Sequence, residues 1–303
     1  MRKTSAALAA LALTAVVLTG CSAAPTFAGA SCDRTDAANG IDQAVTVKGD
    51  LGAKLDVKVD APTKSDKVSF HDAIVGKGTV VTEPGQVLRA NLSVYSGKSG
   101  EYVGSTGDRL WTTALLEQSF PGIKKALACV TGGSRVVGAV PGKDLGAAIA
   151  QVGLTEDDTM VFVADVTGTM LPHADGSPVF NDARGVPTVV RGEGGRPGII
   201  IPDAEQPTKE VVQTLIDGSG QAVGSEMPVF AYTAVNWDTP RDVASSTWDT
   251  APETDLTKVP EDVAKAITGA KVGSQLLVVT PGAKDKSAVA YVVDILGTVP
   301  SGK

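Results

Sequence analysis

The chain has 303 residues, of which 34 are acidic and 27 are basic, so its formal net charge at neutral pH is −7. Because affinity for phosphate groups depends on clustered lysine and arginine side chains, this balance argues against nucleic acid and anionic lipid headgroups as partners. Only two histidines are present, so zinc sites and histidine-based hydrolytic triads lack most of the side chains they need. We therefore expect neither a metal nor a cofactor.

The N-terminal segment, residues 1–20, has the pattern of a cleaved export signal. Two basic residues precede an apolar run over residues 8–18, which is too short to cross a bilayer as a helix. Leu-Thr-Gly-Cys at residues 18–21 resembles the lipobox of bacterial lipoproteins, whose cysteine is acylated. We therefore expect a lipid on Cys21 to anchor the protein to the cell membrane on its extracytoplasmic side. The alternative is that Cys21 is an ordinary small core residue.

Residues 21–40 are rich in alanine, serine, glycine and aspartate and show no hydrophobic period, so we expect this segment to be a tether. It contains Cys32, and one further cysteine, Cys129, lies in the rest of the chain. Disulfides persist outside the cytoplasm, so we expect Cys32 and Cys129 to be joined. The alternative is two independent buried thiols.

Strand-like sequence begins at Val45. Apolar residues alternate with others over residues 88–94, 160–166 and 289–295, as in half-buried antiparallel strands. Helical sequence is scarce, and two of the helical segments begin next to a proline, which a first helical turn tolerates. Short helices are predicted at residues 112–118, 121–128 and 260–267.

The chain also contains an internal repeat. Residues 123–142 share one pattern with residues 263–282, which lie 140 positions later. Residues 161–166 share another pattern with residues 290–295, but there the offset falls to 129. The second copy has therefore lost about eleven residues in the loop that follows Gly282. A period this long indicates a duplicated domain rather than a short structural repeat.

The repeat divides the chain into two predicted domains. The first covers residues 41–172 and the second covers residues 188–300, and each is large enough to bury a core of its own. Between them, residues 173–187 are rich in turn-forming residues and are predicted to be an exposed linker.

Several motifs of both copies resemble one family. A Pro-Gly-aliphatic helix start at residue 121, Gly-Ser-Arg-Val-Val at residue 133 and Val-Phe-Val-x-Asp-Val at residue 161 resemble the FKBP-type peptidyl-prolyl cis-trans isomerases, in their tandem, lipid-anchored bacterial form. The resemblance implies an α+β fold of two FKBP-like domains, each an antiparallel sheet curled over one short helix. It also implies isomerisation of prolyl bonds in exported proteins, without a cofactor.

The resemblance assigns a cleft to each copy. In the first copy the catalytic cleft positions fall at Phe120, Ile123, Phe162, Val103 and Leu145. In the second copy they fall at Tyr232, Val243, Val263 and Tyr291. Both copies lack the family's Phe-Asp pair, and the first copy also lacks its tyrosines. Because the first copy keeps the long loop over residues 143–158 that would roof the cleft, we expect any activity to reside there.

These departures leave a second interpretation open. The protein could be a catalytically inactive FKBP-like lipoprotein that keeps the fold for peptide binding or assembly. A solute-binding lipoprotein of a transporter fits poorly, because that class needs many strand-helix-strand units and this chain has little helix. The partners implied by the family resemblance are prolyl peptide segments of exported proteins.

Overall fold

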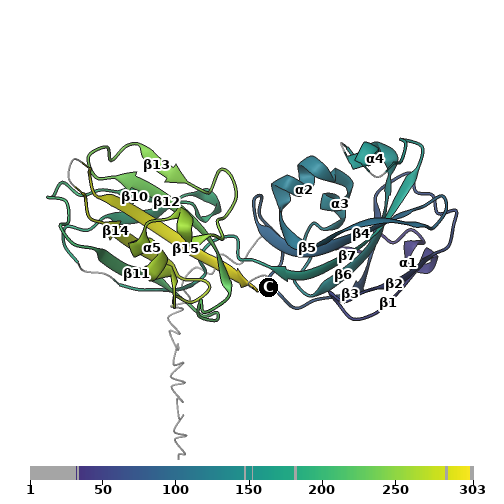
Figure 1. Ribbon diagram of the computed structural model, residues 1–303, viewed down its shortest axis with the longest axis horizontal. Helices are drawn as coiled ribbons and strands as arrows, with labels where there is room; N and C mark the ends of the chain where they lie inside the picture. Colours follow the sequence, from purple (N-terminus) through teal and green to yellow (C-terminus); the bar gives the residue numbers. More distant parts are fainter. Residues whose placement is uncertain are drawn as a thin grey trace, which may run out of the picture.

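The computed structural model of the protein describes residues 32, 34–146, 148–151, 153–180, 183–283 and 286–300. Within these residues the fold consists of antiparallel sheets with a few short helices, as the sequence predicted. Figure 1 shows the two large sheets next to each other, one in each half of the molecule. No helix in the described ranges is both long and apolar enough to cross a membrane. The predicted signal segment and Cys21 lie outside the described residues.

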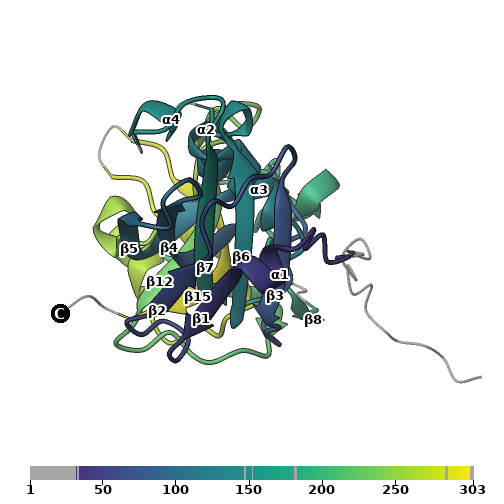
Figure 2. The same cartoon turned by 90° about the vertical axis from the view of Figure 1, so that its right-hand side faces the viewer.

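The first half is built on a five-stranded sheet in the order β3-β6-β7-β4-β5, and every neighbouring pair is antiparallel. Figure 2 looks onto this sheet and shows the strands in that order. The strands are β3 (Ser69–Ile74), β4 (Val87–Ser96), β5 (Tyr102–Thr112), β6 (Ser134–Pro141) and β7 (Thr159–Thr169).

Two short helices, α2 (Thr113–Ser119) and α3 (Pro121–Ala126), pack against one face of this sheet. The hydroxyl of Thr112 caps α2 by accepting a hydrogen bond from the Leu115 amide at 3.0 Å. Pro121 then starts α3, where its missing N–H is not needed. Ile123 of α3 is fully buried against the sheet.

The second half is built on a six-stranded antiparallel sheet in the order β13-β12-β15-β14-β11-β8. The helix α5 (Glu261–Ile267) packs on one face through Val263 and Ile267, which lie four residues apart and are both fully buried. The strands are β8 (Gly176–Pro178), β11 (Val211–Gly218), β12 (Met227–Asn236), β13 (Val243–Ser246), β14 (Gln275–Thr280) and β15 (Val289–Val299). A 3-10 turn, η3 (Leu256–Lys258), precedes α5.

A small hairpin covers the other face of each sheet. In the first half, α1 (Ile41–Ala44), β1 (Val45–Lys48) and β2 (Asp56–Val59) bury apolar side chains against β6 and β7. In the second half, β9 (Thr188–Arg191) and β10 (Pro197–Ile200), with the turn η2 (Glu193–Gly195) between them, cover the equivalent face. Each sheet is therefore enclosed between a helix and a hairpin, and the repeat in the sequence is a repeat of this arrangement.

The segment predicted to be a tether is in fact part of the first half from residue 34 onwards. Ala37 exchanges two backbone hydrogen bonds with Phe70 of β3, at 3.1 and 3.0 Å. Arg34 donates to both carboxylate oxygens of Asp72 at 2.7 Å and stacks over the Phe70 ring. The tether prediction was wrong because these contacts depend on single polar and backbone pairs, which leave no hydrophobic period in the sequence.

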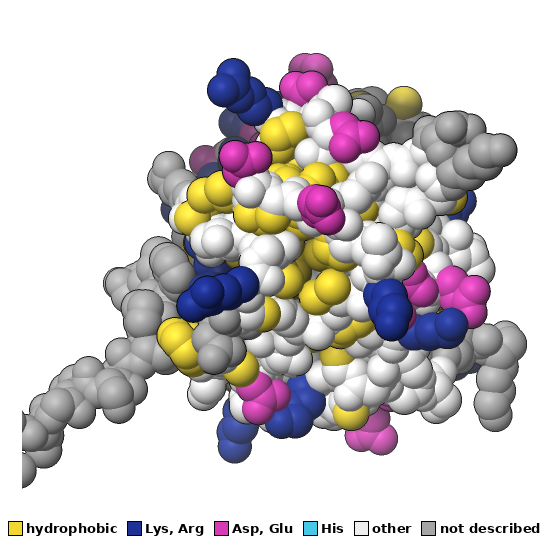
Figure 3. Space-filling model, turned by 90° about the vertical axis from the view of Figure 1, so that its left-hand side faces the viewer, with side chains coloured by type: hydrophobic (Ala, Val, Ile, Leu, Met, Phe, Trp, Pro, Cys, Tyr) yellow, Lys and Arg dark blue, Asp and Glu magenta, His cyan; other side chains and the backbone are white. Residues whose placement is uncertain are grey.

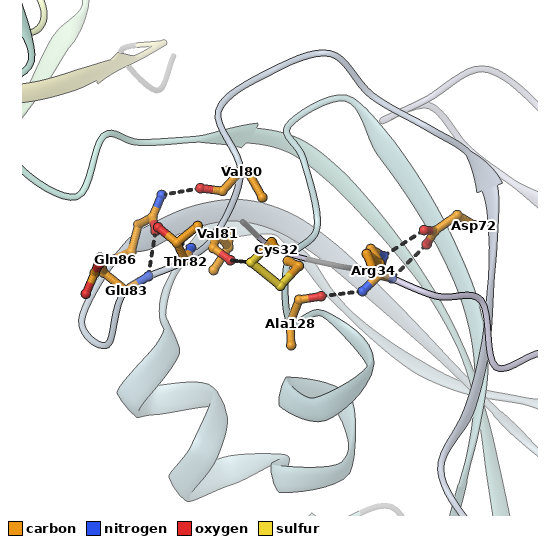
Figure 4. Close-up of a disulfide and its surroundings, with 10 residues drawn as sticks. Cys32, Arg34, Asp72, Val80, Val81, Thr82, Glu83, Gln86 and Ala128 are labelled. Carbon is orange, nitrogen blue, oxygen red and sulfur yellow. Dashed lines mark hydrogen bonds and ion pairs between the residues drawn. A yellow bond between two sulfur atoms is a disulfide. The ribbon is translucent and has the colours of Figure 1, made fainter. Parts of the chain in front are cut away.

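The predicted disulfide is confirmed. Cys32 and Cys129 are joined, with their Cα atoms 5.4 Å apart. Figure 4 shows the disulfide beside Arg34, which also donates a hydrogen bond to the Ala128 carbonyl at 2.5 Å. The disulfide and Arg34 together fix Cys32 and residues 34–40, which we call the N-terminal strap, to the end of α3 and to β3.

The predicted linker also contains regular structure. Residues Gly176–Pro178 form β8, whose register places Gly176 opposite Gly218 of β11. A Cβ atom on Gly176 would lie 2.2 Å from the Asp217 carbonyl oxygen, so glycine is required at this position. The turn-forming residues that suggested an exposed connection therefore include a glycine needed for close strand pairing.

The two halves share one apolar cluster, which we call the junction cluster. It contains Val87 and Met170 from the first half and residues of β12 and β15 from the second half. The sulfur of Met170 packs so closely on Gly297 that a Cβ there would lie 2.2 Å from it. Leu171 donates its N–H to the Leu296 carbonyl at 2.9 Å. The two halves therefore pack directly against each other.

Candidate functional site

Four of the five cleft residues predicted for the first half come together, but inside its core. Ile123, Leu145 and Phe162 belong to one hydrophobic cluster and have no exposed surface. Phe120 packs against the same cluster, and its ring meets Trp111 edge-on with the centroids 5.9 Å apart. The Phe162 ring lies directly over Gly138, where a Cβ would be 2.4 Å from a ring carbon. These side chains therefore serve packing and do not line an open cleft.

The loop expected to cover this cleft instead fills it with its own side chains. Leu145, Ile149 and Leu154 from the loop pack into the cluster that holds Phe162. The ends of the loop are tied together by a hydrogen bond from the Gly142 amide to the Asp158 carbonyl at 2.8 Å. The loop contains the turn η1 (Gly142–Asp144) and the helix α4 (Ala148–Gln151). An open, roofed cleft was the wrong expectation, because three aliphatic side chains of the loop occupy the space.

Val103 and Val243, predicted at equivalent cleft positions of the two halves, do not join the other residues. Val103 is 41% exposed and Val243 is 53% exposed. Val103 is the extra residue of a bulge in the β4–β5 pairing, and Val243 adjoins a similar irregularity in the β12–β13 pairing. A bulge interrupts the alternation of side chains between the two faces of a sheet, so simple alternation does not fix the face on which these two residues lie.

The second half holds an aromatic row on the face of the sheet that carries α5. Phe230 and Tyr232 of β12 stack with their ring centroids 6.4 Å apart, and Tyr291 of β15 lies next, 6.0 Å from Tyr232. Phe230 is fully buried, whereas both tyrosines are only partly buried. Val263 of α5 belongs to the same cluster. Three of the four residues predicted for this cleft are thus brought together in a partly buried row of rings. We call Tyr232, Tyr291 and the core beneath them the tyrosine cleft, after the predicted site.

The tyrosine hydroxyls differ in their surroundings. The Tyr232 hydroxyl lies 3.1 Å from the Ser245 hydroxyl, and the Tyr232 amide donates to Thr247 Oγ1 at 2.9 Å. No described residue hydrogen-bonds to the Tyr291 hydroxyl. Burial raises the pKa of Tyr291 above its ordinary value of 10.0, and the neighbouring Tyr232 raises it further. Tyr291 is therefore protonated at neutral pH and can donate a hydrogen bond.

One end of the second half carries an apolar surface. Figure 3 views the end of the second half that points away from the first half. Hydrophobic side chains gather in the middle of this face, and acidic and basic side chains lie around them. The second half thus presents an apolar surface with a charged rim, as peptide-binding surfaces often do.

A buried polar pair on the opposite face of each sheet was not recognised in the sequence. In the first half, Arg135 donates to both oxygens of Asp165 at 2.6 and 2.8 Å, and both side chains are buried. In the second half the equivalent positions are Gln275 and Asp294, and Gln275 donates to Asp294 at 2.7 Å. Burial raises the pKa of Asp294 to about 6. The repeat offsets would have aligned these residues, since they fall in the matched segments.

The described residues contain no cluster of three or more His, Cys, Asp or Glu side chains placed to hold a metal ion. The arrangement in the tyrosine cleft offers apolar contact, aromatic faces and hydroxyl donors. Such a surface can contact an apolar ligand and donate hydrogen bonds to it.

No protein-family model and no curated protein matches the chain. Among solved structures, the chain is similar to the three FKBP domains of wheat FKBP73, with 16% identity and a TM-score of 0.35 over 80% of this chain and 98% of that one. It is similar to the N-terminal domain of FKBP42 from Arabidopsis thaliana, with 14% identity and a TM-score of 0.31 over 40% of this chain and 98% of that one. It is also similar to a peptidyl-prolyl cis-trans isomerase from Pseudomonas syringae, with 12% identity and a TM-score of 0.29 over 35% of this chain and 77% of that one. The wheat and Arabidopsis structures carry the name of the family that the sequence motifs resemble.

Proposed function

We propose that the protein is a tandem FKBP-type peptidyl-prolyl cis-trans isomerase that acts on prolyl segments of exported proteins. The observation that carries this proposal is the tyrosine cleft, where Tyr232 and Tyr291 are partly exposed over a fully buried Phe230. The motifs shared by the two copies support the same family, since they fall on α3, α5 and the strands that follow each helix.

Prolyl isomerisation requires few functional groups. Rotation about a prolyl amide has a barrier of about 20 kcal/mol, because the planar amide has partial double-bond character. An apolar, aromatic site removes water from the amide and so disfavours its charge-separated planar form. The protonated Tyr291 hydroxyl can donate a hydrogen bond to a carbonyl oxygen of the bound peptide. Together these effects favour the twisted state without a nucleophile, metal or cofactor.

We propose the site in the second half rather than in the first. The sequence favoured the first half because it has the longer loop, but that loop packs Leu145 and Ile149 into the core. Phe162 and Ile123 are fully buried and would reach a peptide only if the core opened. In the second half both tyrosines are partly exposed, and the sequence repeat gives a shorter loop after Gly282. The first half then serves as a structural partner.

The proposal also includes a location for the protein at the outer side of the membrane. A lipid on Cys21 would hold both halves at the outer side of the membrane, where exported chains emerge unfolded. The disulfide between Cys32 and Cys129 supports an oxidising compartment, because structural disulfides are rare in the cytosol.

The test compares isomerisation rates of a prolyl peptide with the full chain and its Tyr291→Phe variant. The wild type should accelerate isomerisation, and Tyr291→Phe should lose about tenfold in rate, because it removes one hydrogen bond to the twisted amide. The matched control is Tyr102→Phe, which alters a 59% exposed tyrosine of the first half. Equal rates for the two variants would contradict the assigned role of Tyr291. Peptide binding without any acceleration by the wild type would instead support the inactive peptide-binding alternative.

A further inference from the structure

An apolar pocket lies beside the disulfide of the first half, and we call it the disulfide pocket. Its volume is about 340 Å³, which is near the lower end of the range for small-molecule sites. Three walls surround it: the loop at residues 81–85, the helix α2, and the end of α3 with the disulfide. All of its lining residues belong to the first half, so it is separate from the tyrosine cleft.

Buried hydrogen bonds and the disulfide hold the walls of this pocket in place. Gln86 is buried, and its Oε1 atom accepts hydrogen bonds from the amides of Thr82 and Glu83 at 2.8 and 3.2 Å. Its Nε2 atom donates to the Val80 carbonyl at 2.9 Å and to the Met170 carbonyl at 2.8 Å. Figure 4 shows the loop held between Gln86 and the disulfide. The pocket is therefore preformed, because the loop cannot collapse onto α2 without breaking these bonds.

The lining of the disulfide pocket is aliphatic. Val81 and Leu116 lie beneath it and are buried in the core of the first half. Around them Pro84, Ala114 and Ala128 are exposed, so a ligand can contact these small side chains directly. None of the described residues that line the pocket is aromatic. Such a surface suits a flexible hydrocarbon chain, which makes dispersion contacts and needs no ring to stack on.

The rim of the pocket is negatively charged. Glu117 and Lys124 pair with each other at 2.9 Å, so their charges cancel. Glu83 is the third ionised residue of the lining, and within the described part of the chain it forms no ion pair. Its side chain is half-buried, so water screens the carboxylate less than at an exposed site. The rim therefore favours a ligand whose polar end is positively charged.

The disulfide wall is specific to the first half. The repeat offset of 140 residues places Gly269 at the position of Cys129. Both residues have a left-handed backbone, with φ of 60° at Cys129 and 85° at Gly269. Because this conformation favours glycine, the cysteine of the first half stands there against the local preference and supplies one wall of the pocket. The pocket thus gives the first half a role that the isomerase proposal does not.

We propose that the disulfide pocket binds the aliphatic chain of a single-chain amphiphile whose head carries an ammonium group. The chain lies along Pro84, Ala114 and Ala128, over the buried aliphatic residues. The ammonium group lies at the rim and pairs with Glu83, whereas the same carboxylate repels an anionic head. The proposal does not rest on the isomerase activity, because the two sites share no residue.

Calorimetric titration of the full chain with three decyl compounds, each below its micelle-forming concentration, tests the ligand class. Decyltrimethylammonium should bind as one molecule per chain. Decyl maltoside has the same chain and an uncharged head, and should bind about threefold to tenfold more weakly. Decyl sulfate should bind more weakly still. Equal affinities for the three compounds, or many molecules bound per chain, would contradict the proposal.

Ala114→Trp tests the location of the site. Ala114 is exposed on α2, so the larger side chain occupies the pocket from the surface and leaves the core intact. The affinity for decyltrimethylammonium should fall by about tenfold or more. Gln118→Trp is the matched control, because Gln118 is exposed on the same helix but does not line this pocket, and it should leave the affinity unchanged. An unchanged affinity in Ala114→Trp would overturn the proposal and place binding elsewhere, the tyrosine cleft included.

Glu83→Gln tests the head group without a change in the shape of the pocket. The variant should bind decyltrimethylammonium about threefold more weakly, and its binding should depend less on salt, because the ion pair is lost. Its affinity for decyl maltoside should stay at the wild-type value, which serves as the control within the same variant. The assignment of an ammonium ligand is overturned if Glu83→Gln binds both compounds like the wild type, or if it loses affinity for both equally.

Discussion

Position 135 holds an arginine that neutralises the buried Asp165, whereas the equivalent position of the second half holds the uncharged Gln275. Asp294 accepts hydrogen bonds from Gln275 at 2.7 Å and from the Ala174 amide at 2.8 Å. Burial raises the pKa of Asp294 to about 6, although the hydrogen bonds from Ala174 and Gln275, and after them the nearby Arg191 and His173, lower it. With Gln275 where the first half has Arg135, the buried Asp294 carboxyl changes its ionisation near pH 6.

The raised pKa of Asp294 predicts that the protein loses stability as the pH rises. Between the unfolded pKa of 3.8 and the folded value of about 6, the folded state holds a proton that the unfolded chain has released. The free energy of unfolding should therefore fall by up to about 3 kcal/mol as the pH rises through this window, and then level off. Denaturant unfolding across this pH range measures the change.

Asp294→Asn should remove most of that slope, because the amide does not titrate. Asp217→Asn is the matched control, since Asp217 lies in the same sheet but is exposed and paired with Lys271. A slope that persists in Asp294→Asn, or that disappears equally in Asp217→Asn, would show that another group is responsible.

The β-bulges in the β4–β5 and β12–β13 pairings explain why sequence patterns located some of the predicted site residues and not others. Tyr232, Tyr291 and Val263 follow regular strand and helix periods, so the repeat located them correctly on one face. Val103 and Val243 lie at irregular pairings, where the alternation that placed them fails. The burial of Phe162 was not visible from the sequence either, because it depends on aliphatic residues of a distant loop.

At the level of elements, periodicity predicted most of the fold. The helices α2 and α3 were expected at residues 112–118 and 121–128 and are found at Thr113–Ser119 and Pro121–Ala126. The strand β8 and the N-terminal strap were missed, because glycine pairing and polar side chains hold them in place. Elements without a hydrophobic face leave no period for sequence analysis to detect.

The N-terminal strap gives the element-scale prediction. The disulfide closes a loop across 97 residues of sequence, which restricts the unfolded chain. The double variant Cys32→Ser/Cys129→Ser should lower the free energy of unfolding by about 2 to 5 kcal/mol. Denaturant unfolding with and without a reducing agent measures this. Reduction should destabilise the wild type and leave the double variant unchanged. A double variant as stable as the oxidised wild type would contradict the proposed role of the strap.

At the scale of the whole molecule, duplication and divergence explain the arrangement. Both halves enclose a sheet between a helix and a hairpin, which preserves the shared motifs. The first half has closed its cleft with the loop over residues 142–158, whereas the second keeps an aromatic surface. The junction cluster joins the halves. This difference between the halves could not be predicted from the sequence, because it depends on contacts between distant segments.

The central claim is that prolyl isomerisation belongs to the tyrosine cleft and not to the Phe162 core. Exchange NMR of a prolyl peptide with a catalytic amount of full chain measures this most directly, once circular dichroism has shown that each variant is folded. The double variant Tyr232→Leu/Tyr291→Leu removes both partly exposed rings of the second half, whereas Phe162→Leu alters a ring with no exposed surface. The account predicts that the double variant loses acceleration by about tenfold or more while Phe162→Leu retains it. Retained acceleration in the double variant, with loss in a folded Phe162→Leu, would contradict it.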